Sequence, residues 1–327
     1  MIAIVLIALA AGAASALMFA SIISGALVSL LLFYLAPLPL MVAAMGWGPL
    51  SASIGGIAAA IGLGAIFGVP YCIAFVIMVA LPAWWLGHLA LLGRPIAAGA
   101  SSDNAAAPAA PADLEWYPVG RILLWISASI ALTTMAALLT LGSDAATITE
   151  TLRRGLLRIL DLTDTAPAPA AETEQWIAAL VVIAPAAAAA VEMTTLTLSL
   201  WLAAKITATS GRLHRPWPDL KSVELPPMTL AALCVAIAFS FAGGMPALLA
   251  QIVTTALIMA YALTGFAVLH TLTLALKSRA FLLGCTYAIV LMFVWPVLLM
   301  AIVGLADAAF GFRRRYLQGK PPPLPAS

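Results

Sequence analysis

Residues 1–50 read MIAIVLIALAAGAASALMFASIISGALVSLLLFYLAPLPLMVAAMGWGPL, and no Asp, Glu, Lys or Arg occurs anywhere from Met1 to Gly93. A membrane-spanning helix needs about 20 predominantly apolar residues, so this stretch is long enough for several crossings. Gly and Pro interrupt it at intervals that predict spans over 2–20, 22–45, 49–68 and 70–92. We expect the first to be a permanent span, because no basic residue precedes it as in a signal peptide. Residues 1–93 are therefore predicted to form an uncharged four-span half.

The composition of the whole chain gives the same class. Of its 327 residues, 64% are apolar and 9% are charged, with a mean hydropathy of +1.11 and a formal net charge of +2. Soluble proteins carry about 25% charged residues. A soluble enzyme, a disordered chain and a nucleic-acid binder are therefore excluded, because none of them keeps so much apolar surface from water. The sequence predicts an integral membrane protein.

Further apolar runs extend this pattern to the end of the chain. They predict an all-α, polytopic transmembrane bundle of about eight to nine spans, with one amphipathic interfacial helix. An Ala/Pro-rich linker (94–118) separates the first half from a C-terminal transmembrane half (119–304), and a basic, Pro-rich tail (305–327) follows. The predicted spans of the second half are 119–142, 175–204, 228–245, 247–275 and 281–304.

The distribution of basic residues leaves the orientation open. Nine spans would divide the 15 basic residues eight against seven between the two sides, which decides nothing. If two apolar runs form one broken element, eight spans remain, and the terminal Arg313-Arg314-Arg315 joins the larger basic group in the cytoplasm. We favour this second arrangement.

Residues 147–161 differ from the spans around them. Ile148, Leu152 and Leu156 fall on one helical face with three arginines mostly opposite, and Thr147 and Glu150 have the spacing of a capping box. The pattern predicts a short amphipathic helix in the headgroup layer, with its arginines near lipid phosphate. Gating or partner contact is the alternative role.

The second run contains Ala36-Pro37-Leu38-Pro39-Leu40. Two prolines so close together remove backbone donors and predict a break or kink. The segment is either a re-entrant or cavity-lining element, in which protein or water satisfies the freed carbonyls, or a turn between two spans.

Glu192 is the one acidic residue well inside a predicted span. With Thr195 and Ser199 it forms a polar stripe on one helical face, and Pro185 is placed to kink the helix and widen a cavity. A carboxylate at bilayer depth must face a cavity, find a donor or hold a proton. The stripe is either a solute- or proton-binding site, or an interhelical hydrogen bond made by a neutral carboxyl.

Small residues recur every fourth position in two spans, where they allow close approach of helices. Such a stripe serves either internal packing or the docking of another membrane subunit. The members are Ala52, Gly56, Ala60, Gly64 and Gly68 in the third span, and Ala8, Gly12, Ala16 and Ala20 in the first.

No motif predicts catalysis or a cofactor. Cys72, Cys234 and Cys285 lie alone in apolar runs, no spacing suggests a metal site, and there is no Walker A sequence. His88, Gln251 and His270 are lone polar groups near span ends, and Asp307 is expected to pair at the interface. We predict a non-enzymatic protein without metal, cofactor or nucleic acid.

Several short segments together resemble the YybS-like family of bacterial membrane proteins of unknown function, along nearly the whole chain. These are Leu81–Gly87 with Leu91–Arg94, Glu115–Arg121, Ser210–Leu220, and Gly304–Asp307 with Arg313–Arg315. The family is remotely similar to the S-components of energy-coupling-factor transporters. The resemblance implies a multi-pass protein of the bacterial inner membrane that binds a vitamin or metal and docks, through a first-helix stripe, on a transmembrane coupling subunit driven by ATPases.

The chain departs from that pattern, since it is longer than a six-helix S-component and shows no vitamin-binding signature. The leading hypothesis is a transporter-type solute-binding subunit with a cavity near Glu192 and Pro37/Pro39. The alternatives are a non-transporting scaffold or envelope assembly factor and, with less support, an intramembrane enzyme acting on lipid. In all three the lipid bilayer is the first partner.

Overall fold

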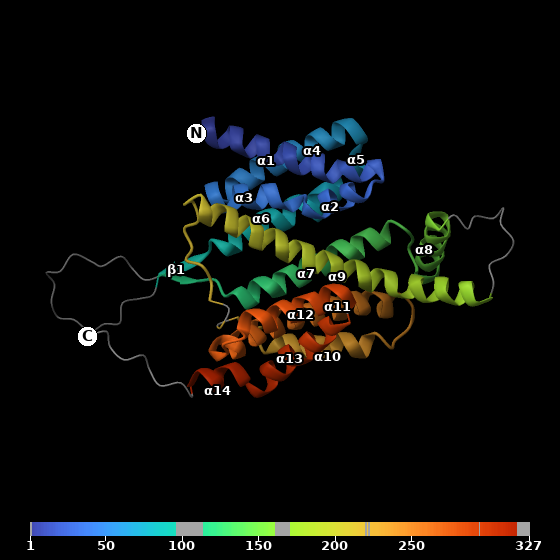
Figure 1. The fold of residues 1–327 in the computed structure, drawn as a ribbon. Helices are drawn as coiled ribbons and strands as arrows, with labels where there is room; N and C mark the ends of the chain where they lie inside the picture. The colour runs from blue at the N-terminus through green and yellow to red at the C-terminus, as the bar shows by residue number, and fades with distance from the viewer. Residues whose placement is uncertain are drawn as a thin grey trace, which may run out of the picture. The chain divides into compact units, whose positions relative to one another are not determined.

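The computed structural model describes residues 2–95, 114–160, 171–219, 221, 223–293 and 295–318. These residues are almost entirely helical, which confirms the predicted all-α fold (Figure 1). The helices of the first half of the chain are α1 (Ile2–Ala20), η1 (Ser21–Ser24), α2 (Leu27–Leu35), α3 (Pro37–Trp47), α4 (Pro49–Phe67), α5 (Val69–Phe75), η2 (Val76–Ala80), α6 (Leu81–Ala90) and α7 (Val119–Leu139). Those of the second half are α8 (Ala145–Ile159), α9 (Ala171–Thr209), α10 (Met228–Phe239), α11 (Gly244–Leu272), η4 (Thr273–Ala275), α12 (Arg279–Phe293), α13 (Pro296–Phe310) and α14 (Phe312–Gln318).

Among the described residues, seven helices are long and apolar enough to cross a membrane. An eighth is added if α13 and α14, bent by 63° at Gly311, count as one span. The chain is therefore a multi-pass membrane protein in its architecture. The seven are Ile2–Ser24, Leu27–Trp47, Pro49–Phe67, Val69–Ala90, Val119–Leu139, Glu172–Thr209 and Gly244–Ala275.

Two predicted spans differ from the structure. The run 228–245 holds only the 12-residue α10, because the chain turns before Gly243 and Gly244, both of which have positive φ. The run 281–304 divides into α12 and α13, with Pro296 as the first residue of α13. Proline lacks the N–H that a continuous helix needs, and it is favoured at a helix start. Hydropathy alone does not register either break.

The Pro37/Pro39 segment is also helical. Pro37 is the first residue of α3 and is buried, and α2 and α3 together form one candidate span of 21 residues. The alternative of a turn between two spans is therefore wrong. The turn lies further along, where Gly48, at φ 93°, ends α3 and Pro49 begins α4. Only glycine adopts that backbone angle readily.

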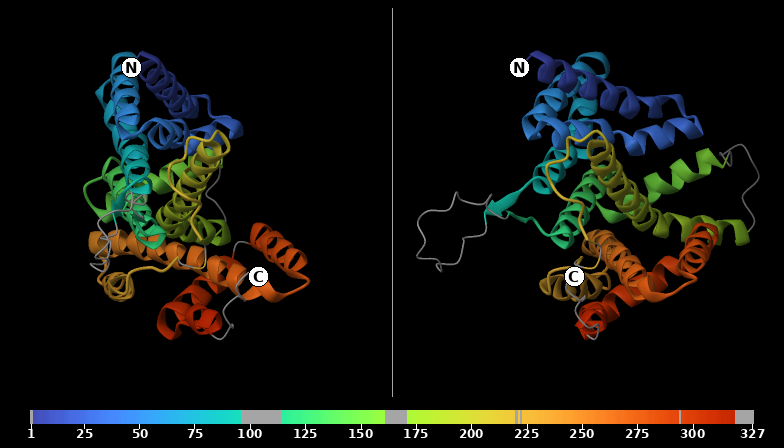
Figure 2. Two further views of the ribbon diagram at one scale, coloured as in Figure 1. Left: turned by 90° about the vertical axis from the view of Figure 1, so that its left-hand side faces the viewer. Right: turned by 60° about the vertical axis from the view of Figure 1, so that its left-hand side comes forward.

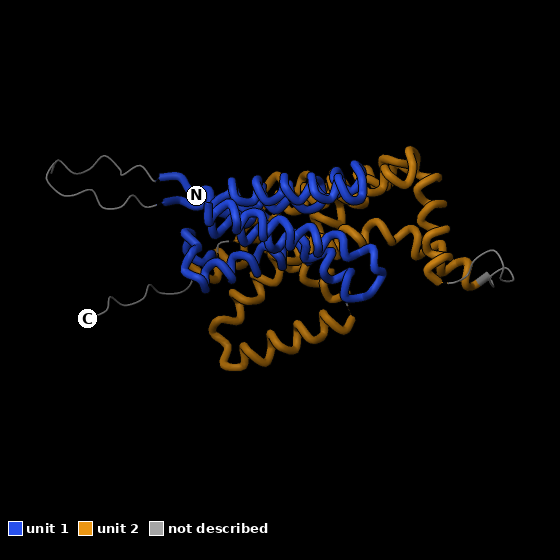
Figure 3. Tube along the Cα trace, turned by 90° about the horizontal axis from the view of Figure 1, so that it is seen from above, with its two compact units in different colours: residues 1–122, 195–218 blue, residues 123–194, 219–327 orange. Residues whose placement is uncertain are grey.

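The chain forms two compact units (Figure 3), residues 1–122 with 195–218, and residues 123–194 with 219–327. In the first unit, α1 and α4 lie side by side (Figure 2). A Cβ on Gly12 would collide with the Gly55 carbonyl, and one on Gly55 would collide with the carbonyl of Ala8. The two backbones are therefore in direct contact, as expected where small residues face each other in a membrane bundle.

The second unit is built on the pair α11 and α13. A Cβ on Gly265 would lie 2.7 Å from the Met300 carbonyl carbon, and one on Gly304 would lie 2.9 Å from that of Tyr261. Tyr261, Leu233 and Leu257 form a buried cluster from α10 and α11. Close helix contact and this cluster hold α10, α11 and α13 together.

The amphipathic helix is present as α8, over Ala145–Ile159, and it runs across the ends of α7 and α9 (Figure 1). Its start differs from the prediction. The N-cap is Asp144, whose carboxylate accepts hydrogen bonds from the Thr147 amide at 2.9 Å and the Thr147 hydroxyl at 2.6 Å. Thr147 is thus the third residue of the helix and not its cap, because aspartate three residues earlier satisfies the same free amide.

The predicted linker and tail lie only partly within the described residues. The linker begins and ends in strands that the composition did not predict, β1 (Gly93–Pro95) and β2 (Leu114–Trp116), which pair antiparallel with Arg94 opposite Glu115. The predicted tail boundary at 305 falls inside α13, and helix continues in α14 to Gln318. Residues 96–113, 161–170 and 319–327 lie outside the described part of the chain.

Candidate functional site

Glu192, on α9, is bound by two hydroxyl groups of α7. The Thr133 hydroxyl donates to one carboxylate oxygen at 2.7 Å, and the Thr134 hydroxyl donates to the other at 3.2 Å. Two successive threonines on a neighbouring helix thus satisfy both oxygens. This geometry supports the interpretation of Glu192 as an interhelical hydrogen-bonding group.

Thr195 and Ser199, the other members of the predicted polar stripe, lie three and seven residues after Glu192. They follow it on α9, but Thr195 begins the part of this helix that belongs to the first unit. Ser199 is fully buried, and its hydroxyl has no hydrogen-bond partner among the described residues. Helix α9 continues through Pro185, and the shallow groove beside that proline is lined by Gln251, Thr254 and Thr255 of α11.

The small-residue stripe of α4 serves packing inside its own unit. A Cβ on Gly56 would lie 3.2 Å from the Ala80 side chain, and one on Gly64 would lie 3.1 Å from that of Cys72. Ala52 and Ala60 are buried, and Gly68 caps the helix C-terminus. These contacts favour internal packing over docking as the role of the stripe. Ala8 and Gly12 of the first-span stripe are likewise covered, by α4.

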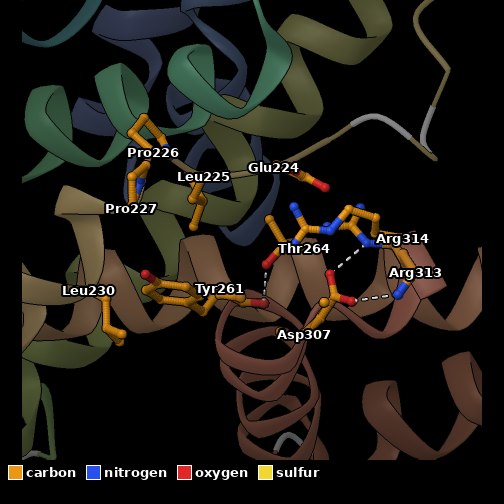
Figure 4. A pocket seen from close by; sticks show the side chains of 13 residues that line it. Glu224, Leu225, Pro226, Pro227, Leu230, Tyr261, Thr264, Asp307, Arg313 and Arg314 are labelled. Carbon is orange, nitrogen blue, oxygen red and sulfur yellow. Dashed lines mark hydrogen bonds and ion pairs between the residues drawn. The ribbon is translucent and has the colours of Figure 1, made fainter.

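A polar pocket of about 310 Å³ lies in the second unit, away from Glu192 (Figure 4). Its wall combines α11, α13 and α14 with the segment Glu224–Pro227 that leads into α10. Tyr261 and Thr264 contribute from α11, and the Thr264 hydroxyl donates to the Tyr261 carbonyl at 2.8 Å. The sequence does not predict this pocket, because the residues of its walls lie up to 90 positions apart in the chain, from Glu224 to Arg314.

A buried ion pair forms one side of the pocket. The Arg313 guanidinium donates to Asp307 at 2.7 Å, and the Arg313 amide donates to the second oxygen of the same carboxylate at 2.8 Å. The two side chains are only 4% and 6% exposed. Gly311, at φ 66°, makes the tight corner that brings them together. Asp307 is thus an ion-pair partner as expected, and its side chain is buried within the protein.

Two further charges line the pocket, and neither forms an ion pair with a described residue. Glu224 and Arg314 are both exposed. Figure 4 shows the Glu224 carboxylate directed toward the arginines across the opening. The pocket therefore offers the Glu224 carboxylate and the Arg314 guanidinium to a ligand. The Asp307–Arg313 ion pair beside them is already neutral as a pair. The sequence signal for this corner was the pair Asp307/Arg313 around Gly311 at the end of an apolar run.

The two histidines singled out in the sequence contact aromatic side chains, and the three cysteines are unpaired with one another. His270 Nε2 lies 2.8 Å from the Tyr287 hydroxyl, and His88 stacks on Trp84. Cys72, Cys234 and Cys285 are free thiols. Within the described ranges, no group of three His, Cys, Asp or Glu is placed to hold a metal ion.

Arg215 joins segments that are distant in the sequence. Its guanidinium donates to the carbonyl of Ala90 at 3.2 Å and to that of Tyr117 at 2.9 Å. Burial lowers the pKa of this side chain, because it disfavours the charged form. Arg215 therefore fastens the loop after α9 to the ends of α6 and the β2 segment within the first unit.

Comparisons with known proteins add no relative. No family model matches the chain, and neither a curated protein nor a solved structure is similar to it. The fold places it among multi-pass helical membrane proteins, and its function must be argued from the site.

Proposed function

We propose that this protein is a transporter-type, solute-binding membrane subunit and that the Asp307 pocket is its binding site. The carrying observation is that Glu224 and Arg314, without ion-pair partners among the described residues, face one pocket in an otherwise apolar bundle. Small-molecule sites combine apolar walls with a few polar groups that fix orientation.

The lining predicts a small zwitterionic solute. A guanidinium binds carboxylate oxygens in a two-pronged geometry, so Arg314 is the site for an acidic group. Glu224 is the acceptor for an ammonium group of the same solute. Arg313 is already held by Asp307 and serves to position its neighbour. The pocket volume of about 310 Å³ suits an amino-acid-sized molecule.

The family resemblance adds to this proposal that the protein lies in the bacterial inner membrane. There it would couple to a transmembrane subunit driven by ATPases. The first-helix stripe is not the docking surface in this proposal, because α4 covers Ala8 and Gly12. A partner subunit would contact lipid-facing positions, such as the exposed Leu9 and Leu17 of α1.

The test is ligand retention by the full chain. The protein is purified gently from its native membranes, and bound small molecules are identified by mass spectrometry. Arg314→Gln is compared with Arg315→Gln, a matched loss of charge one residue away that does not line the pocket. We expect an enriched zwitterionic solute in the wild type and in Arg315→Gln, and its loss in Arg314→Gln. Equal retention by both variants would refute the proposed site.

A second candidate is a non-transporting membrane scaffold. The observation that favours it is the hydrogen bonding of both Glu192 oxygens, which gives this carboxylate a structural role. In the same purification, a scaffold would recover envelope proteins without an enriched solute, and the recovery would not change in Arg314→Gln.

A further inference from the structure

An apolar groove of about 620 Å³ lies between the amphipathic helix α8 and α9. Leu152, Leu156 and Ile159 line it from α8, and Leu180, Ile183 and Ala187 line it from α9. Ile159 is 82% exposed and Ile183 is 57% exposed, so large apolar side chains stand open along its walls. The groove therefore presents an exposed apolar surface that favours an apolar occupant.

Arg154 and Arg158 line this groove, and they differ from Arg153 in how they are ion-paired. Arg153 is taken up by Glu174, with the guanidinium nitrogen 2.6 Å from the carboxylate. Arg154 lies 3.5 Å from Glu150, with both side chains more than half exposed. Arg158 forms no ion pair with any described residue. The groove is thus lined by one weakly paired and one unpaired guanidinium, four residues apart on one helical face.

We infer that this groove binds one anionic phospholipid, with an acyl chain along the apolar walls and its phosphate on Arg154 and Arg158. Guanidinium groups are suited to phosphate oxygens, and each methylene of an acyl chain that the groove buries strengthens binding. This site is separate from the Asp307 pocket and does not depend on the function proposed for it.

Charge complementarity selects the lipid over other occupants. The groove is almost wholly apolar along its length and cationic at α8, which is the layout of an acyl chain below an anionic headgroup. Helix α8 lies where α7 ends and α9 begins (Figure 1), and an amphipathic helix at the ends of spans is expected to lie in the headgroup layer. Another protein segment would need partners for its backbone polar groups, which these walls do not supply.

The experiment measures lipid retention by native mass spectrometry of the purified full chain. Phosphatidylglycerol is added to one sample and phosphatidylcholine with the same acyl chains to another. We expect retention of phosphatidylglycerol to fall about tenfold in the double variant Arg154→Gln/Arg158→Gln, as the loss of a charged hydrogen bond implies. The matched control, Lys277→Gln/Arg315→Gln, removes the same charge elsewhere and should keep wild-type retention.

A second variant tests the apolar part without removing charge. Gly155 lines the groove, and no described atom lies within 4 Å of a Cβ built on it. Gly155→Leu should therefore fill the groove, keep the fold and its melting temperature, and reduce phosphatidylglycerol retention. Wild-type retention by this variant or by the double arginine variant would overturn the inference. So would equal binding of phosphatidylcholine, or binding of inorganic phosphate without lipid.

Discussion

The contact between α11 and α13 gives the sharpest structural prediction. At Gly265 a Cβ would collide with the Met300 carbonyl oxygen and stand 3.1 Å from the Gly304 nitrogen. Both neighbours are backbone atoms of α13, so no side chain can rotate away. Gly265→Ala must therefore push the helices apart and loosen the packing along their whole interface.

The expected cost is that of an overpacked core, about 2 kcal/mol, or roughly a thirtyfold fall in the folded-to-unfolded ratio. Gly284→Ala on α12 is the control, because nothing described lies within 4 Å of its Cβ. In an open helical position that change should stabilise by about 0.5–1 kcal/mol. Thermal unfolding of both variants in the same detergent makes the comparison. If Gly265→Ala unfolds at or above the temperature of Gly284→Ala, the close contact does not exist.

Four other outcomes follow from the structure. Glu192→Gln should lower the free energy of unfolding, measured with a denaturant, by less than about 1 kcal/mol, because an interhelical hydrogen bond in a membrane is worth about 0.6 kcal/mol. Solute retention should be unchanged in this variant. Complete loss of retention would show that the carboxylate acts on the ligand. Asp307→Asn should destabilise by about 3–5 kcal/mol, since it removes the carboxylate that neutralises the buried Arg313 guanidinium. Adding Arg313→Gln should restore part of that loss, and additive effects would disprove the pairing. Hydrogen bonds from Thr147 hold the pKa of Asp144 below its usual value. The stability that this cap adds to α8 is therefore present at neutral pH and is lost as the pH falls through the lowered pKa. Amide hydrogen exchange of α8 should accelerate in that pH range in the wild type but change little in Asp144→Ala. Arg215→Gln should cost about 1.5–3 kcal/mol in the same unfolding assay, as expected for charged hydrogen bonds to two carbonyls, and an unchanged stability would show that the loop is held otherwise.

The helical membrane fold was predictable because it depends on local composition. The uncharged run before Arg94 is continuously apolar, which is typical of bilayer-spanning helices and differs from the alternating pattern of barrel strands. The amphipathic helix was predictable for the same reason, since its leucines and arginines lie within one short segment. Even its start, Asp144, is a local signal, although Thr147 has the same capping chemistry.

The breaks inside apolar runs were harder to place. Hydropathy is continuous across 281–304, yet Pro296 begins a new helix there. At Pro37 a similar proline leaves one candidate span in place, which α2 and α3 form together. The same residue type thus begins a separate helix in one apolar run and lies within a single candidate span in another, so proline alone does not predict the outcome.

The candidate site was only partly visible in the sequence. The sequence singles out Glu192 as a carboxylate inside a predicted span, but its partners Thr133 and Thr134 lie on another helix, about 60 residues earlier. The Asp307–Arg313 pair is local, and its six-residue spacing around a glycine was the available signal. Glu224 enters the same pocket only through the folding of α10 onto α11, which no local pattern encodes.

The solute-binding claim is tested most directly by an experimental structure of the full chain in lipid nanodiscs, prepared without added ligand from gently solubilised membranes. The account predicts density for a small solute between Arg314 and Glu224, and no such density in Arg314→Gln. If α10 and α14 close over this space, or if only lipid or detergent occupies it in both proteins, the solute-binding account is contradicted.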